Sequence, residues 1–117
     1  MTIARLHAGP RMSQAVVHGR TIYLAGQVAN QTKDKSVGEQ TREILGAIDQ
    51  LLAEAGSDKS RVLSATIYLA DIETFVEMNA VWDAWVADGH TPARTTVEAQ
   101  LVAPSYAVEI TCIAAQA

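Results

Sequence analysis

The chain has 117 residues, 49% of them hydrophobic and 19% charged, a balance that predicts one folded domain over residues 1–117 and excludes a disordered chain. A formal net charge of -4 and basic residues dispersed along the sequence argue against a nucleic-acid partner, because a phosphate backbone attracts clustered Lys and Arg. The single cysteine, Cys112, excludes a disulfide within the chain and a zinc site built from several cysteines.

Targeting and cofactor signals are lacking in the sequence. The N-terminus has no apolar run of the kind found in signal peptides, and no segment approaches the roughly 18 consecutive apolar residues of a membrane span. The histidines, His7, His18 and His90, show no metal-ligand spacing. We therefore expect a cytoplasmic protein that contacts no membrane and needs no metal or organic cofactor.

The first elements in chain order are β-strands. A short strand is expected at residues 3–7, and two β-rich runs follow at residues 13–18 and 21–27. The sequence HGR between these runs, at residues 18–20, is typical of a hairpin turn. The N-terminal part of the chain therefore predicts three strands.

A helix is expected next, over residues 36–55, where apolar residues recur at steps of three and four. Ser36 followed by Glu39 forms a capping-box pattern at its start, and Gly56 stands where a helix commonly ends. Start and stop signals at the two ends of one periodic segment favour a single continuous helix.

After this helix the chain alternates again between strand and helix. Asp71 stands at the expected start of a second helix, and Gly89 stands just beyond its end. We expect a strand, the second helix and two further strands, at residues 61–70, 72–87, 95–99 and 106–115.

The resulting order, β-β-β-α-β-α-β-β, predicts an α+β fold in which both helices lie on one face of a mixed six-stranded sheet. In the last strand neither set of alternating side chains is clearly polar: Val108 and Ile110 point to one face, and Thr111 and Ile113 point to the other. Because two helices cover only one face, we expect a second copy of the chain to cover the other face in a homo-oligomer.

Asn79 is the first of three polar residues in unusual positions. It shares an expected helix face with Phe75, Trp82 and Val86, so an amide lies on an apolar stripe. A buried amide without a partner costs on the order of 1–3 kcal/mol. Asn79 therefore either bonds to a neighbouring strand or loop, or lines a pocket where the helix meets the sheet.

Glu109 and Arg94 are the other two. Glu109 lies between Val108 and Ile110 in the most apolar strand, where a carboxylate is on a solvated edge, paired with a cation, or functional. Arg94, in the segment TPARTTVEA, carries a rigid fork of donors matched to a carboxylate. It either clamps Glu109 in a structural ion pair, or binds a small carboxylate ligand while Glu109 acts on another atom. Spacing alone does not separate these two interpretations.

Four segments of the sequence resemble the Rid family, also called YjgF: LAGQVA, FVEMNAVWDAW, TPARTTVEA and YAVEITCIAA. The pattern P-A-R-[ST]-x-V followed by a late [VI]-E-[IV] strand, which contains Arg94 and Glu109, is fairly specific. The segments NAVWDAW and GHTPAR are similar to the YoaB-like subgroup of this family. The resemblance extends over nearly the whole chain.

The resemblance implies a chorismate-mutase-like fold and a homotrimer whose sheets pack into a central barrel, with clefts between the subunits. It further implies that Arg94 holds the carboxylate of a substrate and that Glu109 positions or activates a water. Asn79 and Gly26 are then expected beside the same cleft. A small carboxylate or imino-acid ligand is thus expected at the subunit interfaces.

The sequence also departs from the pattern of many deaminating members. Met12 stands where they have an aromatic residue, often tyrosine, Ala25 stands where they have serine, and Thr96 stands where some have cysteine. Met12 and Thr96 are expected to line the cleft together with Gly26. With the phenol and the hydroxyl lost and the arginine retained, carboxylate binding is better supported than catalysis.

The favoured hypothesis is the hydrolytic deamination of reactive 2-imino acids, which are imine or enamine intermediates, to 2-oxo acids and ammonia. Arg94 and Glu109 are its expected catalytic residues. The alternative is a non-catalytic trimeric binding protein for small carboxylate metabolites, which needs Arg94 but does not need Glu109 as a base. An RNA-cleaving or translation-inhibiting function, known in some relatives, is disfavoured by the acidic charge.

Overall fold

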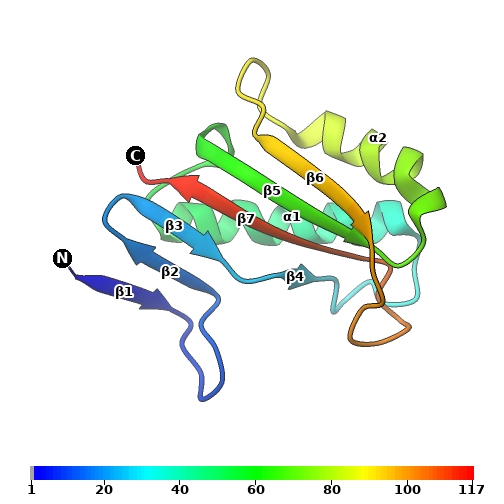
Figure 1. Ribbon diagram of the computed structural model, residues 1–117, viewed down its shortest axis with the longest axis horizontal. Coiled ribbons are helices and arrows are strands. Elements are labelled where there is room, and N and C mark those ends of the chain that lie inside the picture. The colour runs from blue at the N-terminus through cyan, green and yellow to red at the C-terminus, as the bar shows by residue number, and fades with distance from the viewer. Residues whose placement is uncertain (1) are drawn as a thin grey trace.

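The computed structural model describes residues 2–117, which form a mixed seven-stranded sheet with two helices against it (Figure 1). The helices are α1 (Val37–Glu54) and α2 (Phe75–Trp85), and short 3₁₀ turns occur at Lys59–Arg61 and Ile72–Thr74. The strands are β1 (Ile3–Leu6), β2 (Ala15–His18), β3 (Thr21–Leu24), β4 (Gln27–Val28), β5 (Val62–Leu69), β6 (Ala93–Glu98) and β7 (Val108–Ala115).

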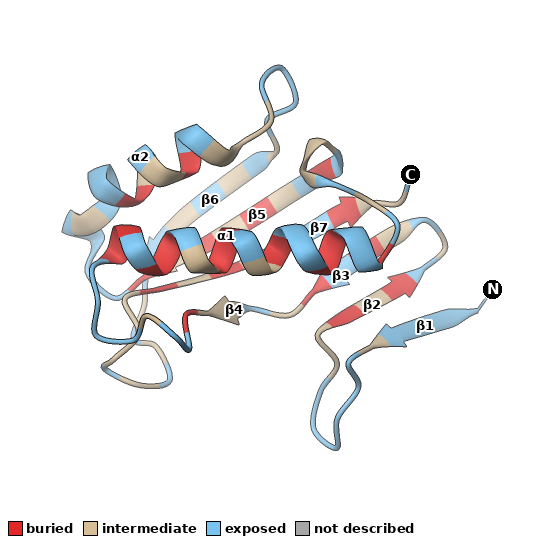
Figure 2. Ribbon diagram, turned by 180° about the vertical axis from the view of Figure 1, so that it is seen from behind, coloured by how far each residue is buried: buried red, intermediate tan, exposed pale blue. Residues whose placement is uncertain are grey.

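The strands follow the spatial order β1-β2-β3-β7-β5-β6, and β4 pairs with β7 outside this path. The pairing of β5 with β6 is parallel, and the other pairings are antiparallel. Both helices lie on the same face of the sheet, which Figures 1 and 2 show from opposite sides. The prediction of an α+β fold with two helices on one face is therefore confirmed.

The seventh strand, β4, is a difference from the expected order. The run predicted as one strand over residues 21–27 divides into two short strands that both stay beside β7. Tyr23 of β3 pairs with Ile113, and Gln27 of β4 pairs with Ile110 of the same strand. The interruption between β3 and β4 thus raises the number of strands from six to seven.

Helix α1 begins and ends close to the predicted positions. The hydroxyl oxygen of Ser36 accepts a hydrogen bond from the N–H of Glu39 at 3.2 Å, so Ser36 caps the first turn. Gly56 follows the last turn with a φ of +80°, a left-handed conformation that glycine adopts without strain. The apolar stripe of α1 is buried and joins the core: Val37, Ile44, Leu45, Ile48, Leu51 and Leu52.

The second helix is shorter than the predicted range of residues 72–87. Its beginning is a 3₁₀ turn, in which the carboxylate of Asp71 accepts a hydrogen bond from the N–H of Glu73 at 3.0 Å. Helix α2 ends at Trp85, because Val86 adopts extended dihedral angles with φ −59° and ψ 140°. Neither helix in residues 2–117 has the length and apolar character that a membrane crossing requires.

Buried and less buried residues alternate along β5 and β7 (Figure 2), so the two faces of the sheet differ in burial. On the face beneath the helices, Val108, Ile110 and Cys112 of β7 are buried, as their alternation predicted. On the opposite face, Ile113 keeps 37% of its surface exposed, and Tyr23, its partner in β3, keeps 46%. Apolar side chains thus remain on a face that neither helix covers, and we call it the open face.

The single thiol, Cys112, has 1% of its surface exposed, and burial raises its pKa to about 12. Because the thiolate is the nucleophile, we expect Cys112 to resist a disulfide reagent at about pH 8 in the folded protein and to react fully in denaturant. The unfolded thiol ionises at a lower pH than the folded one, so the free energy of unfolding falls as the pH rises from about 9 toward 12. Rapid labelling of the folded protein would contradict this burial.

Candidate functional site

Arg94 lies in β6, at the edge of the sheet, on the face covered by the helices. Its partner in the parallel pairing with β5 is Ala65, which is buried on that face. The guanidinium carbon Cζ lies 5.2 Å from the ring centroid of Trp82 and 5.9 Å from that of Phe75, both in α2. Cation–π attraction of this kind contributes about 0.5–2 kcal/mol. Within residues 2–117 no carboxylate forms an ion pair with Arg94, so its N–H donors are not engaged by an acidic side chain.

Two polar atoms without partners belong to residues that neighbour Arg94. Thr96 follows it on the same face of β6, and Asn79 lies one helical turn from Phe75 and from Trp82 in α2. Among the described residues, Oδ1 of Asn79 and Oγ1 of Thr96 are buried and have no hydrogen-bond partner. The side-chain carbonyl oxygen of Asn79 therefore does not bond to a neighbouring strand or loop. These two oxygens near Arg94 have no hydrogen-bond partner from the described residues.

Glu109 lies on the open face of β7, and its carboxylate rests against the backbone at Gly26. Its Cα partner in β5 is Tyr68. A Cβ added to Gly26 would overlap Oε2 of Glu109 and would lie 2.9 Å from its Cδ. Glycine at position 26 therefore leaves room for the carboxylate of Glu109 at this place, which a Cβ would occupy.

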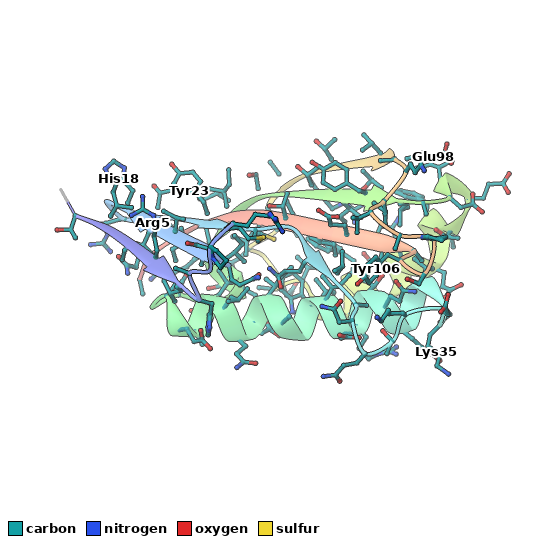
Figure 3. All side chains as sticks on the ribbon, turned by 90° about the horizontal axis from the view of Figure 1, so that it is seen from below. Arg5, His18, Tyr23, Lys35, Glu98 and Tyr106 are labelled. Carbon is teal, nitrogen blue, oxygen red and sulfur yellow. The ribbon has the colours of Figure 1, made fainter. Side chains whose placement is uncertain are left out.

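A cavity of about 420 Å³ opens beside this carboxylate. It lies on the side of the sheet that Tyr23 and His18 mark in Figure 3, away from α1. Its volume falls within the range typical of small-molecule sites. The lining residues come from β5, β7 and the two connections beside them: Gly26, Tyr68, Ala99, Gln100, Leu101, Val102, Glu109 and Thr111. We call this space the Glu109 cavity.

The structure excludes the interpretation in which Arg94 clamps Glu109 within one chain. Arg94 pairs with Ala65 of β5, whereas Glu109 pairs with Tyr68 of the same strand. Ala65 and Tyr68 are separated by an odd number of positions, so they lie on opposite faces of the sheet, and their partners do too. Within one chain the sheet itself therefore lies between the two charged groups.

Met12 and Ala25 bring no polar side chain to the Glu109 cavity. Met12 lies in the loop between β1 and β2, which projects from the sheet in Figure 1, and 48% of its surface is exposed. It does not line the cavity. Ala25 is half-buried, and its N–H donates a hydrogen bond to the carbonyl oxygen of Gln14 at 2.9 Å. Within one chain, Met12 is thus separate from the groups with which the resemblance associates it.

Tyr68 and residues 99–102 are parts of the cavity that the sequence analysis did not single out. Tyr68 lies between Ile67 and Leu69 in the sequence of the strand. This alternation predicts that its side chain points to the face of the sheet opposite to theirs. Its position opposite Glu109 depends on the register between β5 and β7. Residues 99–102 form an irregular connection, for which no periodic pattern exists.

Comparisons with known proteins agree with this architecture. Residues 2–116 match the family model described as endoribonuclease L-PSP. The chain is 48% identical over 115 residues to the RutC family protein YoaB of Escherichia coli, covering 98% of this chain and 99% of that protein. A crystal structure of a YjgF-family member from Neisseria meningitidis has a TM-score of 0.97 and 47% identity, covering 100% of this chain and 97% of that chain.

A more distant relative carries a named activity. It is a rat protein called 2-iminobutanoate/2-iminopropanoate deaminase, 32% identical over 109 residues, covering 89% of this chain and 79% of that protein. On the fold, the family match and these identities, the chain belongs to the YjgF family, also called Rid. Within that family its similarity to YoaB assigns it to the YoaB-like subgroup.

Replacing Gly26 by Ala tests the close approach of Glu109 to Gly26. Gly26 does not have a positive φ, so alanine fits the backbone, and the added Cβ is expected to displace the carboxylate of Glu109. A crystal structure of the variant should show this side chain rotated away from β4. The matched control is Gly46→Ala in α1, where the Cβ meets no atom within 4 Å and should raise the free energy of unfolding by about 0.5–1 kcal/mol. An unmoved Glu109 in Gly26→Ala would refute the contact.

Proposed function

We propose that this protein hydrolyses 2-imino acids to 2-oxo acids and ammonia in clefts between the subunits of a homotrimer. The observation that carries the proposal is the position of the two charged groups. Arg94 has no carboxylate partner on one face at the sheet edge, and Glu109 lines a cavity on the other face. A second copy whose open face packs against the β6 edge brings an Arg94 toward a Glu109 cavity and also covers the apolar open face.

Arg94 binds the substrate carboxylate in this proposal. The guanidinium lies against the rings of Trp82 and Phe75, which hold it by cation–π attraction while its N–H edge remains available. Two parallel N–H donors then match the two oxygens of a carboxylate, and such bidentate pairs fix the orientation of a ligand as well as its affinity. Asn79 and Thr96 line the same half of the cleft.

Glu109 holds the attacking water. An ionised carboxylate only accepts hydrogen bonds, so it orients a water with one O–H toward itself and the oxygen lone pair toward the imine carbon. The water oxygen bonds to that carbon, the C–N bond breaks in the tetrahedral intermediate, and both water protons end on the nitrogen, which leaves as ammonia. Positioned acid–base assistance of this kind is typically worth about 10²–10⁴-fold.

A second candidate function is binding of a small carboxylate without hydrolysis. The observation that favours it is the absence of polar side chains at Met12 and Ala25, where many deaminating members of the family carry an aromatic residue, often tyrosine, and a serine. Such a protein retains the role of Arg94 and has no need of Glu109 as a base. The two candidates differ in whether ligand binding leads to turnover.

The first test generates imines with an amino-acid oxidase and lets semicarbazide compete for them. We expect the wild-type protein to lower the rate of semicarbazone formation, and Arg94→Ala to abolish this effect because the substrate carboxylate is no longer held. Arg42→Ala, at an exposed arginine of α1, is the matched control and should behave as wild type. No effect of the wild-type protein with any of several amino acids would overturn the hydrolytic proposal and favour binding alone.

Replacing Glu109 by Gln separates hydrolysis from binding. The amide preserves the shape of the side chain but removes the negative charge that orients the water. We expect imine hydrolysis to fall by about 10²-fold or more, while a 2-oxo acid product still binds at its wild-type affinity. Calorimetric titration with 2-oxobutanoate measures the binding, and the semicarbazide competition measures the turnover. Unchanged turnover in Glu109→Gln would show that Glu109 does not hold the water.

A further inference from the structure

We infer that Tyr68 is a further catalytic residue of the Glu109 cavity, where its phenol donates a hydrogen bond to the imine nitrogen of the substrate. This inference rests on the proposed hydrolysis. It adds a hydrogen-bond donor, Tyr68, to a cavity in which the carboxylate of Glu109 is an acceptor. None of the four segments that carry the family resemblance includes Tyr68.

The position of Tyr68 follows from the register between β5 and β7. It is half-buried in β5, and its Cα partner in antiparallel β7 is Glu109. Residues directly opposite each other in an antiparallel pair have Cβ atoms about 4.5–5.5 Å apart on the same face. Both side chains line the same cavity of about 420 Å³. A ligand atom beside the carboxylate of Glu109 is therefore within reach of the tyrosine ring.

The phenol of Tyr68 is not committed to the fold. Within residues 2–117 no protein group forms a hydrogen bond with it, whereas the hydroxyl of Tyr106 donates to Oδ1 of Asn30 at 2.6 Å. Within the described residues, the buried side-chain oxygens without a partner are those of Asn79 and Thr96, so the hydroxyl of Tyr68 remains accessible to solvent. Tyr68 lines the cavity, and an accessible hydroxyl without a protein partner is available to a ligand there.

Imine hydrolysis needs a donor as well as an acceptor. As the water oxygen bonds to carbon, the electron pair of the C=N bond moves onto nitrogen, and a hydrogen bond to that nitrogen stabilises the charge that develops there. Glu109 only accepts when ionised, but a neutral phenol donates. Tyr68 keeps its own proton throughout, because the two protons that the nitrogen gains come from the water.

The other side-chain donors of the cavity are less suited to this role. The hydroxyl of Thr111 already donates to the carbonyl oxygen of Leu24 at 2.7 Å. Gln100 is exposed on the connection between β6 and β7, outside regular structure. Tyr68 is half-buried in β5, whose backbone pairs with β6 on one side and with β7 on the other.

Tyr68→Phe removes the O–H and nothing else, which makes it the direct test. With imines supplied by an amino-acid oxidase, we expect kcat to fall about tenfold or more while KM stays near the wild-type value, since the lost bond acts on the reacting nitrogen. The melting temperature should be unchanged. Tyr23→Phe, on the same face but outside the cavity, is the matched control and should retain wild-type kcat. Gln100→Ala should also retain it.

The outcomes separate this inference from the proposed function. A wild-type protein that hydrolyses no imine overturns the proposed function and this inference together. A wild-type protein that is active, with an unchanged kcat in Tyr68→Phe, overturns the inference alone, as does a loss confined to Gln100→Ala. A lower activity explained by a lower melting temperature, with kcat per folded chain intact, also overturns it. A fall in kcat at constant KM and constant stability supports it.

Discussion

The alternation of side chains across β5, β6 and β7 is the constraint on which the rest of the structure depends. Because Arg94 pairs with Ala65 and Glu109 pairs with Tyr68, the register assigns the arginine to the helix-covered face and the glutamate to the open face. No change of rotamer brings the two groups together through a hydrogen-bonded sheet. Any function that uses both on one small ligand therefore requires more than one chain.

Each face provides its charged group with a different environment. Beneath α2, the rings of Trp82 and Phe75 hold the guanidinium of Arg94, and no ion pair with an acidic residue of the chain competes for its donors. On the open face, the missing side chain of Gly26 leaves room for the carboxylate of Glu109. The same open face exposes apolar side chains such as Ile113, so the surface that favours association also contains the cavity.

Much of the fold could be predicted from the sequence because it is encoded locally. The apolar period of α1, its cap at Ser36 and its stop at Gly56 are local signals, and the structure confirms them. The division between β3 and β4 was not predictable, because it depends on pairing with a distant strand. Arg94 and Glu109 were recognised as unusual residues, but their separation onto two faces follows from a register that spacing along the chain does not contain. The position of Tyr68 was missed for the same reason.

The most direct test of a site shared between chains is complementation between two inactive variants. Arg94→Ala and Glu109→Gln chains, each inactive alone, are mixed in equal amounts, unfolded and refolded together, and assayed for imine hydrolysis. In a trimer with clefts between neighbours, every mixed assembly contains one cleft with an intact Arg94 and an intact Glu109, so about a quarter of the wild-type activity should return. No recovery in the mixture, with mixed trimers verified by mass spectrometry, would contradict the shared site.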